Sequence, residues 1–397
     1  MPMKSVFPEP VFLTSSEEVA RFCSSVSQED FVTIDTEFVR EKTYWPHLCL
    51  VQIAGAKEVG LIDACVTGLD LAPLQALLAK PDCLKVFHAA RQDLEIFLHI
   101  FGELPTPIFD TQIAAMVAGF GEQVGYDTLV GSLTGTQIDK SHRFTDWARR
   151  PLSKAQIAYA AADVTHLRVV YELLREKLEE QGRCSWVEAE LAILKARETY
   201  CPDPYQLWRK LKPRTNNRRV LGVLQECVAW REQEAQRIDL PRQHVIRNES
   251  LLEVATVRPV TAQELSRIRG VSESFATSAL GLGLLEAVAR GEARQPDSLP
   301  VSSGKKKGEV KKVSQDVIAL LRVLLAMKSE THHVATKILV SGDELEKMAA
   351  GDTDLPVLAG WRYDIFGRDA QALLSGEMTL RIRNGEVQLD RLSHVND

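Results

Sequence analysis

Four carboxylates and one tyrosine in the first half of the chain have the types and spacing that metal-dependent phosphoryl chemistry requires. Asp35 and Glu37 lie two residues apart in an apolar, strand-like segment, so their side chains project from the same face of the strand. Asp93 falls in the first turn of a predicted helix that follows a short buried strand. Tyr159 and Asp163 are four residues apart in a helical pattern and share one face of that helix.

Each of these motifs also has a purely structural interpretation. The Asp35–Glu37 pair suits an edge strand with one solvated face, and Asp93 suits the positive end of a helix dipole. Tyrosine and aspartate at this spacing occur by chance in many helices. Gathered in one place, however, four carboxylates repel one another, and a pair of divalent cations relieves that repulsion and assists in-line displacement at phosphorus. Because every ligand is an oxygen, we expect Mg²⁺ or Mn²⁺.

The segments around these residues predict an α/β layer. Strand patterns at 31–38, 47–54 and 58–62 follow one another closely, which favours an antiparallel meander. Ser153 and Gln156 have the spacing of a capping box, which predicts a long helix that runs to about residue 180. The other expected elements are a strand at 84–88 and helices at 71–78, 89–101, 111–120 and 126–133.

The second half of the chain is predicted to be helical until close to its end. Apolar residues recur at helical spacing in two groups of similar size, and the segment between the groups is rich in Pro, Ser, Gly and Lys, as flexible linkers are. In the first group the expected helices are 220–238, 250–257, 262–267 and 272–290. The expected domains are 1–203 (α/β), 204–294 (all-α), a linker at 295–312, and 313–397 (all-α).

Composition places the chain among ordinary globular proteins. It has 397 residues, 45% of them hydrophobic and 26% charged. No apolar run is long enough to span a bilayer, and no secretory signal pattern is present. Seven cysteines are scattered without a C-x-x-C pair, which argues for reduced thiols in the cytoplasm rather than disulfides or a zinc site.

Charge is distributed unevenly between the two halves. Residues 1–200 carry 19 Lys and Arg against 28 Asp and Glu, whereas residues 201–397 carry 29 against 26. An acidic half joined to a mildly basic half agrees with a carboxylate enzyme that carries an anion-binding unit. Acidic segments also occur where only solubility is required, so the charge distribution alone does not decide the function.

The carboxylate motifs resemble those of a known family. Asp35-x-Glu37, Asp93 in an H-A-A-x-x-D segment, and Tyr159-x-x-x-Asp163 are similar to the three motifs of the DEDD 3′–5′ exonucleases, in their tyrosine subclass. Their context resembles bacterial ribonuclease D, with L-V-Q-I at 50–53, F-D-T at 109–111, and K-S, T-D-W and R-P-L segments between 140 and 152. Residues 204–290 resemble an HRDC domain (helicase and ribonuclease D C-terminal), and residues 314–384 resemble a second, diverged copy.

This resemblance implies a ribonuclease H-like exonuclease fold, a mixed sheet flanked by helices, followed by two small helical-bundle domains. It implies a metal-dependent 3′–5′ exoribonuclease that releases 5′-mononucleotides, with tRNA precursors as substrates for 3′ maturation. Carried over by position, Asp35, Glu37, Asp93 and Asp163 would bind two ions of Mg²⁺ or Mn²⁺, and Tyr159 would help to orient the attacking water. We expect RNA as the partner, a monomer, and neither membrane attachment nor a nucleotide cofactor.

A second group of residues is expected to contact substrate or support the site. His88 ends a buried strand, where a satisfied structural histidine is the competing interpretation, and Gln52 is a candidate for a supporting amide. Arg143 and Arg150 suit phosphate contacts or a solvated loop equally well. A basic run suits RNA binding and stacking, although an exposed helix face gives the same pattern. The candidates in that run are Trp208, Arg209, Lys210 and Lys212.

Two rival functions follow from the same residues. The carboxylate set also serves 3′–5′ exodeoxyribonucleases, and the motifs do not distinguish RNA from DNA. No G-x-x-x-x-G-K-[ST] segment occurs, so no helicase motor is expected in this chain. A non-catalytic RNA-binding protein would be expected to lack at least one of the four carboxylates, and all four are present.

Overall fold

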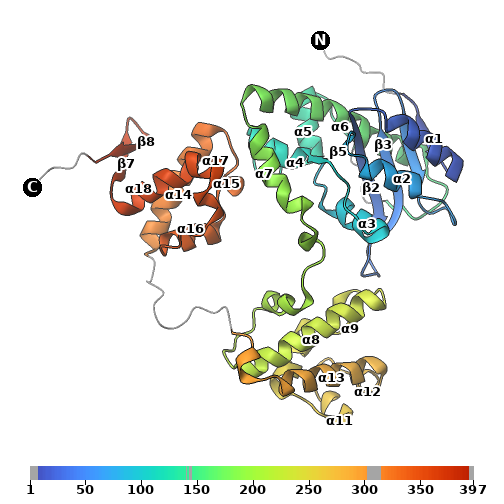
Figure 1. Cartoon of the computed structure of the whole chain (residues 1–397), viewed down its shortest axis with the longest axis vertical. Helices are drawn as coiled ribbons and strands as arrows, with labels where there is room; N and C mark the ends of the chain where they lie inside the picture. Colours follow the sequence, from blue (N-terminus) through green and yellow to red (C-terminus); the bar gives the residue numbers. More distant parts are fainter. Residues whose placement is uncertain (1–7, 140, 143–144, 302–313, 393–397) are drawn as a thin grey trace, which may run out of the picture.

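The computed structural model describes residues 8–139, 141–142, 145–301 and 314–392, which form three units (Figure 1). The first unit contains a six-stranded mixed sheet. Its strand order is β1 (Pro10–Leu13), β4 (Val59–Asp63), β3 (His47–Ala54), β2 (Phe31–Val39), β5 (Leu84–Phe87) and β6 (Ile108–Asp110). The antiparallel meander β2–β3–β4 is present as predicted, and β1, β5 and β6 add to it in parallel. The short strands β1 and β6 were not predicted.

The two faces of the sheet are covered by different helices. Helices α1 (Ser16–Val26), α2 (Ala72–Ala79) and α3 (Arg91–Phe101) share an apolar core with Val32 and Ile34 of β2. The long helix α6 (Lys154–Glu180) covers the opposite face, where the Thr33 hydroxyl donates to the Val164 carbonyl at 2.7 Å. The predicted capping box of Ser153 and Gln156 begins α6. Further helices of this unit are α4 (Thr111–Ala118), α5 (Tyr126–Thr134) and α7 (Cys184–Lys195), with a 3₁₀ turn at Arg197–Thr199.

The first helical unit is built around the long helix α8 (Arg218–Arg237), which is preceded by the 3₁₀ helix η2 (Pro204–Leu211). The other helices are α9 (Arg242–Val245), α10 (Asn248–Val257), α11 (Ala262–Leu265), α12 (Glu273–Ala276) and α13 (Ala279–Ala293). The helix expected at 272–290 is thus divided into α12 and α13, since Thr277 and Ser278 interrupt it and Ser278 caps α13.

The beginning of the expected linker is not flexible. Residues Pro296–Ser298 form a 3₁₀ turn, and the Leu299 side chain is buried against Gly222 of α8. The Arg218 guanidinium donates to the Leu299 carbonyl at 2.7 Å. Residues 295–300 therefore belong to the first helical unit, because Leu299 supplies apolar contact that the linker-like composition conceals. Residues 302–312 of the expected linker lie outside the described residues.

The second helical unit repeats part of the first. It contains α14 (Gln315–His332), α15 (Thr336–Leu339), α16 (Gly342–Ala349), a 3₁₀ turn (Pro356–Leu358), α17 (Gly360–Arg362), a π turn (Tyr363–Gly367), α18 (Arg368–Ser375) and the hairpin β7 (Met378–Arg383)–β8 (Glu386–Arg391). In both units a long helix is followed by a four-residue helix, two extended residues and a further helix. The first extended residue is Ile246 (φ −161°, ψ 141°) in one unit and Val340 (φ −159°, ψ 139°) in the other.

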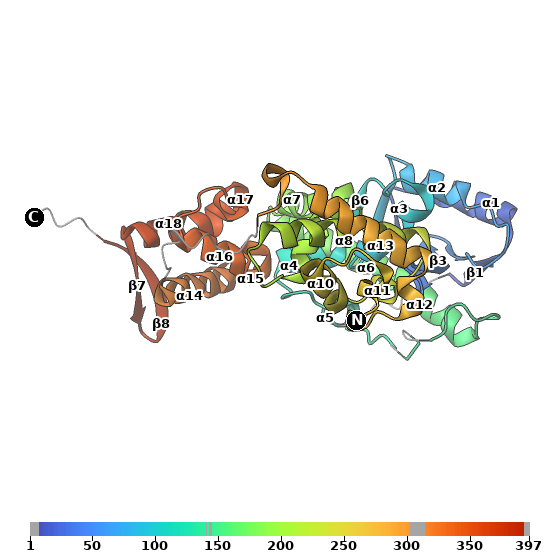
Figure 2. The same ribbon diagram turned by 90° about the horizontal axis from the view of Figure 1, so that it is seen from below.

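The second helical unit shares an apolar core with the first unit, which contains the six-stranded sheet. Side chains of α4 and α7 pack with side chains of α14 and α15 in one cluster, and Figure 2 shows α15 beside α4. The Ala335 N–H donates to the Met116 carbonyl at 3.2 Å, and Arg362 pairs with the buried Glu190 at 2.5 Å. This unit is therefore part of the folded body and not an independent appendage.

The first helical unit contacts the first unit, which contains the six-stranded sheet, through the β2–β3 loop. Trp45 in this loop stacks on His99 of α3, with ring centroids 4.0 Å apart. The Tyr44 hydroxyl donates to Glu232 of α8 at 2.5 Å, and Arg242 pairs with the same carboxylate.

Within the described part of the chain, no helix is long and apolar enough to cross a membrane.

Candidate active site

The carboxylates of β2 point toward helix α6. Because side chains alternate along a strand, the burial of Ile34 against α1–α3 places Asp35 and Glu37 on the opposite face, which α6 covers. Asp163 of α6 meets them there, and one carboxylate oxygen from each of these three residues lies within 4.8 Å of the others. Three oxygens so close together suit a hard divalent cation.

A cavity of about 300 Å³ contains all five residues that the motifs singled out. Its wall includes Asp35, Glu37, Asp93, Tyr159 and Asp163. They come from β2, the first turn of α3 and one face of α6. The structure therefore brings together segments that are more than 120 residues apart in the chain.

Asp93 is buried close to a second negative charge in this cavity. Its carboxyl is buried, and burial, followed by the negative charge of Asp35, raises its pKa well above the usual value. The Thr36 hydroxyl donates to Asp93 Oδ1 at 2.5 Å and opposes that rise. A bound cation would stabilise the ionised form more strongly than one hydroxyl can. The donor chemistry of the four carboxylates therefore fits a divalent metal.

The Tyr159 side chain lines the same cavity, and its hydroxyl is protonated at neutral pH. Burial, followed by the neighbouring charge of Asp163, raises the pKa of its hydroxyl far above neutrality. Tyr126 of α5 lies on the other side of Asp163 and donates from its hydroxyl to the Asp163 backbone carbonyl. Tyr159 can therefore donate a hydrogen bond at neutral pH, and Tyr126 anchors the turn of α6 that carries Asp163.

His88 lies in the cavity wall beside Tyr126, with ring centroids 5.2 Å apart. Its Nδ1 contacts the Thr111 hydroxyl at 2.9 Å. Its Nε2 is buried and makes no hydrogen bond of normal geometry among the described residues, although the backbone of Val124 lies near enough to the ring to raise its pKa. Burial lowers the pKa of the imidazole, so the ring is neutral near pH 7. An unsatisfied buried nitrogen in a cavity wall is available to a ligand.

Gln52 lies outside the cavity wall, directly behind it. It is fully buried on β3, where it pairs across the strands with Asp35. Directly opposed residues of antiparallel strands share a face, so the Gln52 side chain is a neighbour of Asp35. Neither amide atom of Gln52 has a hydrogen-bond partner within the described ranges.

Arg150 has a structural role that the sequence did not indicate. Its guanidinium pairs with the buried Asp63 at 2.5 and 2.8 Å and donates to the Cys49 carbonyl at 2.8 Å and the Trp147 carbonyl at 2.7 Å. These contacts occupy the donors that a phosphate would need, so the expected phosphate contact of Arg150 is not supported. Arg143 lies outside the described residues.

The expected stacking role of Trp208 is contradicted by its burial. Its side chain is 1% exposed and belongs to the core between η2 and α8. The apolar face of η2 turns inward with Leu207 and Trp208, while Arg209, Lys210 and Lys212 remain exposed. Of the four candidates in this run, the three cationic side chains are exposed to solvent and Trp208 is not.

Sequence reasoning missed two residues that shape the site. Thr36 lies between the two motif residues of β2, and its hydrogen bond to Asp93 depends on how α3 approaches the strand. Tyr126 was assigned to a helix without a role, and its contact with Asp163 depends on the packing of α5 against α6. The position of Thr36 inside the D-x-E motif was the available signal for the first; no local pattern indicated the second.

Comparison with known proteins agrees with this geometry. The family model described as 3′-5′ exonuclease matches residues 10–179, and the HRDC domain model matches residues 220–288. The crystal structure of Escherichia coli RNase D, described as an exoribonuclease involved in structured RNA processing, is 30% identical with a TM-score of 0.79. The alignment covers 93% of this chain and 99% of that one.

Curated relatives match along nearly the whole chain. Ribonuclease D of Gluconacetobacter diazotrophicus is 54% identical over 97% of this chain and 98% of the relative. Ribonuclease D of Granulibacter bethesdensis is 53% identical over the same shares. The predicted resemblance and the ribonuclease H-like fold class are confirmed, and the chain belongs to the ribonuclease D family of 3′–5′ exoribonucleases.

Proposed function

We propose that the chain trims RNA 3′ ends by hydrolysis at a site where Asp35, Glu37, Asp93 and Asp163 bind two divalent cations, Mg²⁺ or Mn²⁺. Members of this family depend on divalent metal. We propose that this chain binds two such ions. The observation that carries it is the close approach of the Asp35, Glu37 and Asp163 oxygens, within 4.8 Å, in the cavity that Asp93 also lines.

Tyr159, His88 and Gln52 each have a different role in this mechanism. The four carboxylates would hold the cations, which would supply activation of the attacking water and neutralisation of charge on the leaving 3′ oxygen. Tyr159 lines the cavity beside Asp163, where burial and that charge raise the pKa of its hydroxyl, so it can orient the attacking water by donating a hydrogen bond. His88 offers its buried Nε2 to the terminal nucleotide. Gln52 lies beside Asp35 and supports that carboxylate.

We propose tRNA precursors with 3′ trailing nucleotides as a substrate class, processed to 5′-mononucleotides by a cytoplasmic monomer. The similar E. coli enzyme is described as acting in structured RNA processing. The exposed cations Arg209, Lys210 and Lys212 of η2 would contact phosphates of the structured part. The second helical unit is proposed to be a diverged HRDC domain, supported by the repeated order of helices described above.

Calorimetric titration with Mn²⁺ tests the metal site. The full chain should bind two ions, and Asp163→Asn should bind fewer, whereas Asp82→Asn, at an exposed turn, should match the wild type. In parallel, a tRNA precursor with a labelled 5′ end and a short 3′ trailer should shorten stepwise with the wild type and with Asp82→Asn, but not with Asp163→Asn. One ion per chain together with normal trimming would refute the two-ion site and leave the exonuclease assignment intact.

A further inference from the structure

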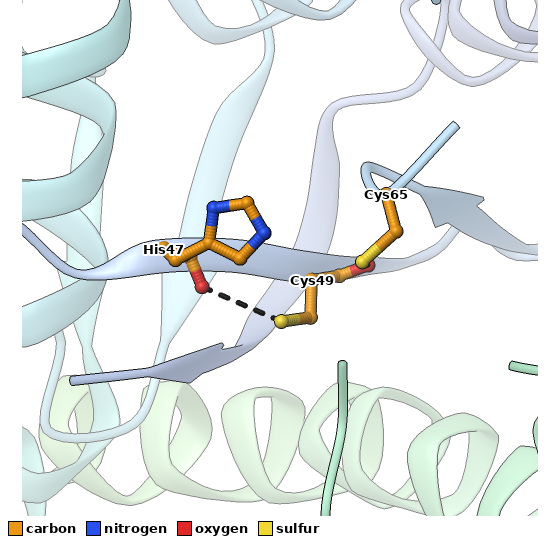
Figure 3. Close-up of side chains that lie close together, drawn as sticks. All are labelled: His47, Cys49 and Cys65. Atoms are coloured by element: carbon orange, nitrogen blue, oxygen red, sulfur yellow. Dashed lines mark hydrogen bonds between the residues drawn. The ribbon is translucent and has the colours of Figure 1, made fainter. Parts of the chain in front are cut away.

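A second group of potential metal ligands lies outside the cavity, and its chemistry differs from that of the carboxylates. One ligand atom each from His47, Cys49 and Cys65 lies within 4.8 Å of the other two. Figure 3 shows His47 and Cys49 on β3 and Cys65 on the segment that follows β4. None of the three lines the carboxylate cavity. The scattered cysteine spacing predicted no such cluster.

Strand pairing creates the cluster. The β2–β3 register steps from Glu37–Leu50 to Phe38–Leu48, so Cys49 is the extra residue of a β-bulge. The antiparallel β3–β4 pair then brings Cys65, just beyond the end of β4, beside Cys49. The Cys65 N–H donates to Asp63 Oδ1 at 3.1 Å, and Asp63 is in turn held by Arg150. The backbone around both thiols is therefore fixed.

The thiols have weak partners in the structure. Cys49 Sγ contacts the His47 carbonyl at 3.4 Å (Figure 3). Cys65 Sγ contacts the Cys49 carbonyl at 3.7 Å. Both cysteines are free, with no disulfide between them. The two thiols also interact with each other. Each thiol gives up little when it turns toward a metal ion, since sulfur forms weak hydrogen bonds.

We infer that His47, Cys49 and Cys65 form a site for a thiophilic divalent cation of the zinc class, with a fourth position open to solvent. Two sulfurs and one imidazole are the donor set that Zn²⁺ favours and Mg²⁺ does not. Zinc–ligand bonds of about 2.0–2.3 Å require ligand atoms roughly 3.5–4 Å apart, so the ligand atoms, which lie within 4.8 Å of one another, need to approach by at most about 1.3 Å. His47 is exposed and Cys65 is partly exposed, which gives the ion an entry path and leaves both side chains room to turn.

Proton balance is satisfied by release to solvent. Each thiol loses its proton as its sulfur bonds to the ion, and the imidazole binds as the neutral ring. Burial raises the pKa of Cys49 to about 12, and the nearby Arg150 guanidinium opposes that rise. The ion must therefore displace the Cys49 proton rather than meet a preformed thiolate, as it does at other thiol ligands.

The cluster is positioned to influence the catalytic strands. Cys49 forms the bulge opposite the step that follows Glu37, and it packs in one small core with Trp147, close to Tyr159. An ion at this site would fix β3 against the segment after β4, directly behind the strand that carries the carboxylates.

Cobalt is a suitable probe because thiolate ligands give Co²⁺ an intense sulfur-to-metal absorption that carboxylate ligands do not. The reduced full chain, titrated with Co²⁺ alone, should develop this absorption to one equivalent, and added Zn²⁺ should remove it. Cys65→Ser should abolish the absorption or weaken Co²⁺ binding at least tenfold. Cys184→Ser and Cys201→Ser change exposed thiols outside the cluster and should behave as the wild type.

The test separates this site from the carboxylate site. Asp163→Asn should lose metal-dependent nuclease activity and retain the sulfur-to-cobalt absorption, so failure of one assignment leaves the other standing. Cys65 is partly exposed, so its replacement should leave the fold intact even where Cys49→Ser does not. Absence of the absorption in the wild type, or its persistence in Cys65→Ser, would overturn the inference. A Cys49–Cys65 disulfide that resists reduction would also overturn it.

Discussion

Replacement of Asp93 by asparagine should stabilise the metal-free protein while it destroys the active site. The Asp93 carboxyl is buried beside Asp35, and both burial and that neighbouring charge raise its pKa. Asparagine has nearly the same shape and still accepts the hydrogen bond from Thr36. For a buried carboxyl with a like charge nearby, removal of the charge should contribute on the order of 1–3 kcal/mol. In a domain of this size that corresponds to roughly 5 °C in melting temperature.

Divalent metal should make the wild type more stable than Asp93→Asn, the reverse of the order expected without metal. At a concentration one hundred times its dissociation constant, a bound ion adds about 2.7 kcal/mol to the free energy of unfolding. The wild type should gain this stabilisation, and Asp93→Asn should lose most of it. Scanning calorimetry in EDTA and in millimolar Mg²⁺ or Mn²⁺ measures both effects, with Asp82→Asn as the surface control. A lower melting temperature of Asp93→Asn in EDTA would refute the reasoning.

The pH dependence of the stability of the metal-free protein tests independently whether the pKa of Asp93 is raised. The ordinary aspartate pKa is 3.8, and the folded value is raised. The favourable contribution of protonated Asp93 is therefore fully present below about pH 3.8 and is lost as pH rises through the folded pKa. The stability advantage of Asp93→Asn over the wild type in EDTA should widen across that interval. If the stability advantage of Asp93→Asn narrows as pH rises, the pKa of Asp93 is not raised in the folded protein.

Three further changes probe other parts of the structure. Tyr159→Phe should lower kcat roughly 10–100-fold by loss of water orientation without loss of metal-induced stabilisation; a wild-type kcat would exclude this role. Replacement of Arg209, Lys210 and Lys212 by alanine should weaken binding of structured RNA and reduce the salt slope by about 2–3, and an unchanged slope would argue against phosphate contacts. Deletion of 314–397 should uncover the apolar side chains of α4 and α7, so size-exclusion chromatography should show aggregation; a monodisperse product of unchanged melting temperature would contradict the shared core.

The placing of most motif residues toward one cavity could be predicted because it follows from local periodicity. Alternation along β2 puts Asp35 and Glu37 on one face, and helical spacing puts Tyr159 and Asp163 on one face of α6. The capping box at Ser153 also depends on residues only three apart. These features are encoded within one strand or one turn, so the sequence is sufficient to identify them.

Features that depend on tertiary contact were missed or misassigned. Trp208 looked like an exposed stacking residue because nothing local shows that η2 packs its apolar face on α8. Arg150 looked available to substrate because its partner, Asp63, lies 87 residues away. The Cys49–Cys65 proximity likewise follows from strand register and a bulge. Strands β1 and β6, of four and three residues, are too short for a periodic pattern to appear.

Shortening of a 5′-labelled RNA hairpin with a single-stranded 3′ tail tests the central claim most directly. The RNA and its DNA counterpart would each be incubated with Mg²⁺, Mn²⁺ or EDTA, with Asp163→Asn alongside the wild type. The account predicts an RNA ladder that shrinks by one nucleotide at a time and is absent with EDTA and with the variant. Equal or faster shortening of DNA would contradict the assignment of RNA as substrate, and a ladder that persists in EDTA would contradict the metal site.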